Sequence, residues 1–255
     1  RGFSYLDMAI YYDATGDDYV LPEIRYRAIE TAMGQSGGGS WGHTLSFPTS
    51  NAERLHMYNP GYGALNAAGT RCFFLIALAK KSGIDHPEID AAIKRASRFY
   101  GTFVDKGAIP YGCGSPAGTD DSNGKNFGAA YGFYALGKKH EAKYFSMCSN
   151  HAAFSRRGGH GSATLWYYTP LSAIIAGPRG VTASMRNMRW FYTLSRRHDG
   201  SFVKQGEQVG IGGNPVRNPT ATHALYYSAP LRQLITTGKD ADKDCWFTDE
   251  ELDEL

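Results

Sequence analysis

Apolar residues recur every three to four positions in four segments of the chain, which is the spacing of a helix with one buried face. The clearest segment runs from 87 to 104, where Ile89, Ala92 and Ala96 share one side and charged residues occupy the other. The remaining three segments lie at 21–32, 142–152 and 181–195. The pattern predicts four amphipathic helices, each with one side against the protein and one side in water.

A second set of segments is apolar or small around nearly the whole helix. These segments lie at 3–13, 63–79, 127–136, 163–176 and 221–234, in alternation with the amphipathic set. A helix without a polar side has to be covered from every direction. The alternation therefore predicts two concentric layers, with the apolar helices inside. No alternating run of strand length competes with this pattern, which excludes an α/β fold.

Short internal repeats indicate that one helical unit recurs. Residues 165–171 and 225–231 both carry two adjacent tyrosines and end in Pro-Leu. Asn59-Pro60 and Asn218-Pro219 repeat a helix start, with Asn as the cap and Pro in the first turn. Glycine-rich links follow the amphipathic segments. Recurring helical hairpins of this kind predict an all-α fold, an α/α toroid in which the ring is complete or lacks some hairpins.

The chain divides into one large domain and a short tail. We expect residues 1–238 to form the toroid, while 239–255 is an acidic segment in which Thr248–Glu251 resembles the start of another helix. Both ends look cut, so we expect additional domains of the same polypeptide.

The composition of the chain limits the classes of partner that we expect it to bind. A net charge of +3 is too small to indicate nucleic acid, and it slightly favours anionic small molecules or glycans. The longest apolar run, Cys72–Ala79, is far shorter than a membrane span. We expect no nucleic acid and no membrane span, and we favour an extracytoplasmic location, periplasmic or secreted.

Two turns carry a likeness to known proteins. Residues 38–42 and 199–202 both contain Gly-Ser followed by an aromatic ring. In these turns the chain resembles the α/α-toroid superfamily, which includes terpenoid cyclases, protein prenyltransferase β-subunits, thioester domains and several polysaccharide lyases. Within it the chain is similar to an uncharacterised bacterial family. The resemblance covers nearly the whole chain, and it implies a fold rather than an activity.

The well-known activities of that superfamily lack their motifs here. A cyclase needs an acidic triad, whereas Asp17-Asp18 and Asp120-Asp121 are bare pairs. A thioester domain needs Glu-Gln after Gly-Cys-Gly, and Ser115-Pro116 stands there instead. The Asp, Cys and His set of a prenyltransferase zinc site is not visible either.

The links from outer to inner helices fall on one rim of such a ring, and they carry the candidate site. Aromatic rings can stack on sugars, His and Tyr can transfer protons, and an Asp can act as acid or base. The candidate catalytic residues are His43, Asp121, His160, Tyr167 and His223. The candidate substrate-binding residues are Trp41, Tyr62, Asn66, Tyr111, Arg157, Trp166 and Asp199. The hypothesis depends on these side chains converging on one cavity.

Several readings of this rim stay open. A polysaccharide lyase needs a base and a group that neutralises the substrate carboxylate, whereas a glycoside hydrolase needs two opposed carboxylates, for which the rim offers Asp121 and Asp199. His43, His160 and His198 come from separate loops, so we predict neither metal nor cofactor. Trp41 could equally wedge two helices apart. We expect a carbohydrate-active protein with a glycan or other ligand in its central cavity; the alternative is a non-catalytic scaffold that binds a glycan or peptide.

Overall fold

The computed structural model describes residues 2–42, 45, 64–118, 125–151, 171–202, 219–228 and 231–240. Within these ranges the protein is all-α, with eight α-helices and no β-strand, as the sequence predicts. The helices are α1 (Gly2–Thr15), α2 (Leu21–Met33), α4 (Asn66–Lys81), α5 (Pro87–Gly101), α6 (Asn126–Ala135), α7 (Lys139–His151), α9 (Pro178–Ser195) and α10 (Pro219–Tyr227). Three short 3₁₀ turns join them, η1 (Asp18–Val20), η2 (Ala173–Ala176) and η4 (Ile235–Thr237). No helix in the described ranges is both long and apolar enough to cross a membrane.

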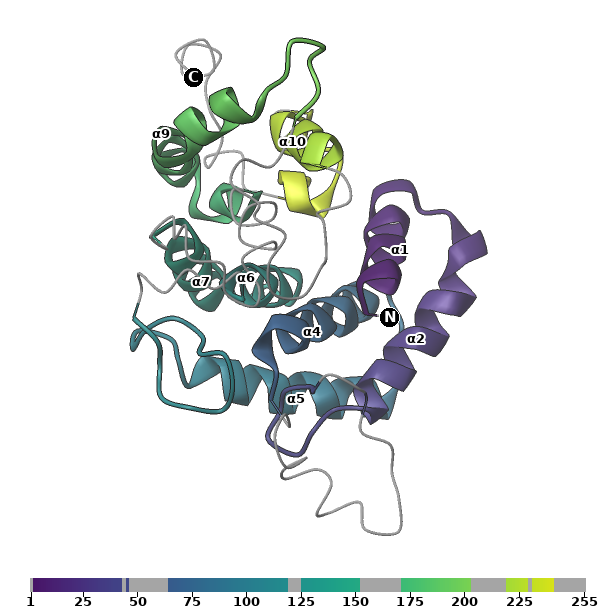
Figure 1. Cartoon of the computed structure of the whole chain (residues 1–255). Helices are drawn as coiled ribbons and strands as arrows, with labels where there is room; N and C mark the ends of the chain where they lie inside the picture. The colour runs from purple at the N-terminus through teal and green to yellow at the C-terminus, as the bar shows by residue number, and fades with distance from the viewer. Residues whose placement is uncertain are drawn as a thin grey trace.

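The helices pack in the order in which they alternate along the chain. Helix α4 lies between α1 and α6, and α6 packs on α7. Helix α2 packs on α5, and α7 packs on α9. Figure 1 shows α1, α4 and α6 on the inside, with α2, α5 and α7 around them. The last described segment returns to the beginning of the chain, because η4 contacts α1.

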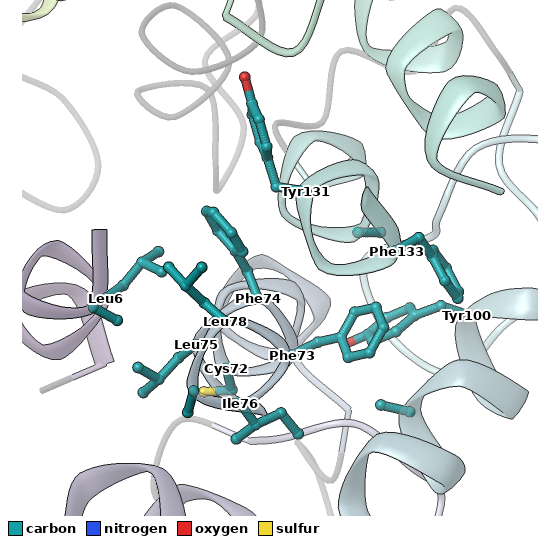
Figure 2. Close-up of a cluster of buried hydrophobic side chains, with 14 of the residues drawn as sticks. Leu6, Cys72, Phe73, Phe74, Leu75, Ile76, Leu78, Tyr100, Tyr131 and Phe133 are labelled. Atoms are coloured by element: carbon teal, nitrogen blue, oxygen red, sulfur yellow. The ribbon is translucent and has the colours of Figure 1, made fainter. Parts of the chain in front are cut away.

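The core is built around α4, whose side chains are buried in every direction. Its residues from Cys72 to Ala79 are all buried, which is what a helix without a polar side requires. Figure 2 shows Leu75 and Leu78 turned toward Leu6 of α1, with Phe73 and Phe74 turned toward α6. The ring of Phe74 stacks on that of Tyr131 at 5.3 Å between centroids. Helix α6 is buried in the same way from Asn126 to Phe133.

Some helix ends differ from the sequence prediction. Helix α10 ends at Tyr227 rather than Leu234, because Pro230 cannot donate the helical hydrogen bond and clashes with the preceding turn. Helix α4 begins only at Asn66. The N–H groups of Leu65 and Asn66 donate instead to the carbonyls of Trp41 and Tyr111. The start of α4 is therefore held by neighbouring links, while Asn59 and Pro60 lie outside the described residues.

The two Gly-Ser-aromatic segments form the same turn. The N–H of Ser36 donates to the carbonyl of Ser40 at 2.9 Å, and the N–H of Arg197 donates to that of Ser201 at 2.7 Å. Gly39 and Gly200 occupy equivalent places in the two turns, with φ of 93° and 83°. These values lie in the left-handed region that favours glycine. Two links far apart in the sequence thus share one backbone conformation.

Candidate functional site

An open groove lies where the end of the described chain meets its first helix. Its volume is about 630 Å³, within the range of small-molecule sites. One wall comes from α1 and the other from the segment 231–239. The lining residues are Asp7, Ile10, Tyr11, Ala14 and Thr15 from α1, and Arg232, Gln233, Leu234 and Lys239 from the segment.

The local sequence explains how both walls of the groove are placed. Residues 7, 10, 11 and 14 share one face of α1 because a helix repeats every 3.6 residues. The opposite wall turns sharply, since Arg232 adopts a φ of 50° and Gly238 one of 86°. The Nε of Arg232 donates to the carbonyl of Gly238 at 3.3 Å. This bond holds the guanidinium end of the arginine side chain beside the groove.

The charges of the groove are unequal. Arg232 and Lys239 are cationic, and Asp7 is the one carboxylate among the lining residues. Burial raises the pKa of Asp7, and the nearby charge of Arg71 lowers it in part. The pKa of Tyr11 is also raised, by its hydrogen bond to Asp17 at 2.9 Å and by the negative charge of that residue. Tyr11 therefore keeps its proton to a higher pH than a free tyrosine.

A charged network below the groove joins three parts of the chain. The Nζ of Lys81, in α4, lies 2.5 Å from Oδ1 of Asp13 and 2.7 Å from Oδ2 of Asp240. The side chain of Asp13 is only 7% exposed. Lys239 donates to the backbone carbonyl of Asp13 and lies 3.9 Å from its Oδ2. The network fastens the last described segment to α1 and α4.

A second polar cluster holds the links at the start of the inner helices. The hydroxyl of Ser40 donates to Oδ1 of Asn66 at 2.8 Å and lies 3.0 Å from the hydroxyl of Tyr100. The Nδ2 of Asn66 donates to the carbonyls of Pro110 and Gly112 at 2.9 and 2.7 Å. Asn66 is fully buried. In α6 Asn126 repeats part of this device, because its Oδ1 accepts from the N–H of Ile109 at 3.0 Å.

These contacts give two predicted binding residues a place in the framework. The side-chain oxygen and nitrogen of Asn66 are both hydrogen-bonded to residues of the links. Trp41 is 1% exposed, and its indole N–H donates to the carbonyl of Thr31 at 2.7 Å. In this structure Trp41 packs against α2 and presents no ring face to a ligand. This is the position expected if Trp41 wedges between helices, the alternative to binding a sugar.

Two other predicted binding residues are accessible. Tyr111 is half-buried, and the Nζ of Lys125 lies 5.6 Å from the centre of its ring. Asp199 is exposed in the second Gly-Ser turn, where it accepts from the N–H and the hydroxyl of Ser201. These two bonds lower the pKa of Asp199. The contacts of Asp199 are those of a residue that shapes its own turn.

The other predicted residues fall outside what the structure describes. They are His43, Tyr62, Asp121, Arg157, His160, Trp166 and Tyr167. The backbone of His223 lies in α10, and its side chain is not described. The convergence of His43, Asp121, His160, Tyr167 and His223 on one cavity therefore stays a prediction.

Sequence reasoning missed the groove, although one signal pointed to it. Asp7 is an exposed carboxylate in the mostly apolar inner helix α1, which also contains Asp13, and Arg71 is a buried arginine in α4. Charged residues are rarely buried without a reason. Arg232 and Lys239 gave no such signal, because they follow α10 in a short irregular segment. Among the described residues no group of His, Cys, Asp and Glu is arranged to hold a metal ion.

The sequence matches one domain family along most of its length. No curated protein and no solved structure is detectably similar to it. The family match covers residues 1–238, which include both walls of the groove as far as Gly238 and both Gly-Ser turns. The chain therefore belongs to the family described as Domain of unknown function (DUF6288).

Proposed function

We propose that the protein is a carbohydrate-active α/α toroid that binds an acidic glycan, with the groove between α1 and residues 231–239 as its described binding site. The observation that carries the proposal is the make-up of this groove, in which two cations stand beside an apolar floor. The toroid is part of the proposal, because a ring that closes on itself is what brings residues 7–15 next to residues 231–239.

Three contacts support ring closure. Helix α1 is packed on α4 on one side and on η4 on the other. Lys81 bonds to Asp13 and to Asp240, so the two ends of the described chain share one cation. The buried hydroxyl of Tyr131 lies 2.8 and 2.7 Å from the carbonyls of Leu171 and Thr236. Tyr131 thus ties α6 to two later segments that an open array would leave apart.

The groove suits a sugar that carries a carboxylate. Ile10 and Leu234 offer apolar surface for the C–H face of a pyranose ring. The guanidinium of Arg232 can bind a carboxylate through two parallel hydrogen bonds. Arg232 and Lys239 are both held by protein groups, so little side-chain freedom is lost when a ligand binds. Asp7 and Gln233 are left to bond sugar hydroxyls.

The same residues argue against hydrolysis in the groove itself. A retaining or inverting glycosidase needs two carboxyl groups on opposite sides of the bond, and the lining residues offer only Asp7. A lyase needs a base, and Tyr11 has a raised pKa. We assign binding to the groove. Any lyase or hydrolase chemistry belongs to the predicted rim residues, and a purely binding scaffold is the second candidate.

Matched ligands test the groove. Calorimetric titration with a galacturonate trisaccharide should give a dissociation constant about tenfold lower than the neutral galactose trisaccharide, since a charge-assisted pair is worth roughly 1.5–3 kcal/mol. Arg232→Gln should remove that preference, and Arg25→Gln, an exposed arginine on α2, should keep it. Equal affinities for the two trisaccharides, or an unchanged preference in Arg232→Gln, would refute the site.

A separate assay decides whether the protein is an enzyme. Lyase action on a uronate polymer leaves an unsaturated product that absorbs in the near ultraviolet, whereas hydrolysis gives new reducing ends without that absorbance. His43→Ala and His160→Ala should abolish either activity while the helical circular dichroism stays unchanged. Binding without any product would favour the scaffold.

A further inference from the structure

Helix α9 differs from the other outer helices in its charge. Its eighteen residues and the turn after it contain five arginines before the first acidic residue, Asp199. The arginines are Arg179, Arg186, Arg189, Arg196 and Arg197, and all five are exposed. Exposed helix faces usually mix both signs of charge.

The arginines of α9 differ from Arg27 of α2 in their ion pairs within the described ranges. On α2, Arg27 bonds to Glu23 and Glu30 at 2.7 and 3.0 Å. Among the described residues none of the five α9 arginines forms an ion pair, although the charge of Arg197 contributes to the lowered pKa of Asp199. All five side chains are exposed, and no carboxylate in the described part of the chain pairs with them.

The first turn of α9 makes the excess charge costly. The amino end of a helix carries a partial positive charge, so an arginine there is unfavourable and an acidic residue is favoured. Arg179 stands in this turn, which has no acidic residue and no side-chain cap. The arginine at this position does not stabilise the helix, which points to a role for the exposed face of α9.

Aromatic and apolar surface accompanies the arginines. Arg186, Trp190 and Leu194 follow one another on the helix at intervals of four. Trp190 is 44% exposed and Leu194 is 62% exposed. The opposite side of α9 is already used, because Val181, Tyr192 and Ser195 are buried in the protein.

We propose that this outer face of α9 binds a linear polyanionic polysaccharide. The cations form a row along a helix about 27 Å long, with Arg179 and Arg186 about 10 Å apart along the axis. A row one helix wide fits an extended polymer, whose carboxylates the guanidinium groups can bind in pairs. The ring of Trp190 can stack on a pyranose face within the same row.

A membrane is the less suitable occupant. An interfacial helix inserts an apolar face between its basic flanks. The apolar face of α9 packs on η2 and α7 instead, so among the described side chains the exposed side of α9 carries only Trp190 and Leu194 as large apolar groups beside its arginines. The polysaccharide proposal goes beyond the groove, and it rests on the carbohydrate proposal only in the choice of polymer.

Long polygalacturonate, neutral galactan, duplex DNA and phosphatidylglycerol vesicles are the probes. Wild-type protein should bind polygalacturonate and not galactan, with an affinity that falls as sodium chloride rises. The double variant R186Q/R189Q should lose about tenfold in affinity. The control R25Q/R98Q removes the same charge from exposed positions on α2 and α5 and should change the affinity less than about threefold. Trp190→Ala, checked for folding by circular dichroism, should also weaken the binding of polygalacturonate.

The outcomes separate this surface from the groove. Trisaccharide binding tests the groove, because it is expected to depend on Arg232. If the trisaccharide does not bind but the polymer still binds through α9, only the groove proposal is refuted. Equal losses in R186Q/R189Q and R25Q/R98Q would show that only total charge matters, which overturns the α9 proposal. DNA or anionic vesicles that bind as tightly as polygalacturonate would overturn it as well.

Discussion

The hydroxyl of Ser40 donates a hydrogen bond of 2.8 Å to Oδ1 of Asn66, across a gap of 26 residues in the sequence. The amide of the same asparagine donates to the carbonyls of Pro110 and Gly112. One buried side chain therefore connects the link before α4 with the link before α6. Asn66 therefore holds the two links together through its side chain.

Asn66→Ala should lower the free energy of unfolding by about 2–4 kcal/mol, because it removes three hydrogen bonds and takes the side-chain donor away from the carbonyls of Pro110 and Gly112. Urea unfolding followed by circular dichroism measures the change. Asn187→Ala, an exposed position on α9, is the control and should stay within about 0.5 kcal/mol of wild type. A similarly small effect at Asn66 would mean that the cluster does not hold the links.

The two equivalent turns offer a matched pair of glycines. Gly39 and Gly200 both have left-handed φ. A Cβ on Gly39 would lie 2.6 Å from the carbonyl oxygen of Arg95, whereas one on Gly200 would meet nothing within 4 Å. Gly200→Ala should therefore cost only the backbone strain, about 1 kcal/mol. Gly39→Ala should cost about 3 kcal/mol, because the link must also move away from α5.

Thermal and urea unfolding of the two alanine variants test this difference. Equal losses of stability would show that the link around Gly39 moves freely, and the close approach between this turn and α5 would then not be a fixed feature of the fold.

Sequence reasoning reached the helices but not the groove. The buried positions of α4 and α6 could be predicted, because a run such as Cys72–Ala79 has no polar side to leave in water. The groove could not, since its walls are more than 200 residues apart and no local pattern joins Asp7 to Arg232. Trp41 shows the same limit. A tryptophan ring can stack on a sugar or pack in a protein core, and only its burial in the structure distinguishes the two roles.

Asp7 should make stability depend on pH in an unusual direction. Burial raises its pKa in the folded protein, so the folded state favours the protonated form. The stabilisation is present at low pH and is lost as the pH rises through the folded pKa. Asp7→Asn should therefore be more stable than wild type at pH 7, and the difference should shrink as the pH falls through the folded pKa and disappear below the ordinary value of 3.8.

Urea midpoints of Asp7→Asn and wild type at pH 3 and pH 7 measure this effect. Asp18→Asn, on the exposed surface, serves as control and should show no such pattern. A variant that is less stable than wild type at pH 7 would indicate that attraction to Arg71 outweighs burial.

Two adjacent lysines test how firmly the last described segment is held to α1 and α4. Lys81 joins Asp13 and Asp240, and the Asp13 side chain is 7% exposed. Lys80 bonds to Asp85 and Asp90, which are 83% and 53% exposed. Lys81→Met should cost about 1–2 kcal/mol, since it removes the closest cation from a nearly buried carboxylate. Lys80→Met should change stability little, because exposed ion pairs are weak.

The pH dependence adds a second measurement. Burial lowers the pKa of Lys81, but its bonds to Asp13 and Asp240 raise it above the ordinary 10.5. A raised lysine pKa gives stability that is present below 10.5 and lost as the pH rises through the folded value. Wild type should therefore lose stability above pH 10.5 more steeply than Lys81→Met. Limited proteolysis should also cut near residues 231–240 faster in Lys81→Met than in Lys80→Met. Equal cleavage rates would indicate that α1 and η4 stay together without this network.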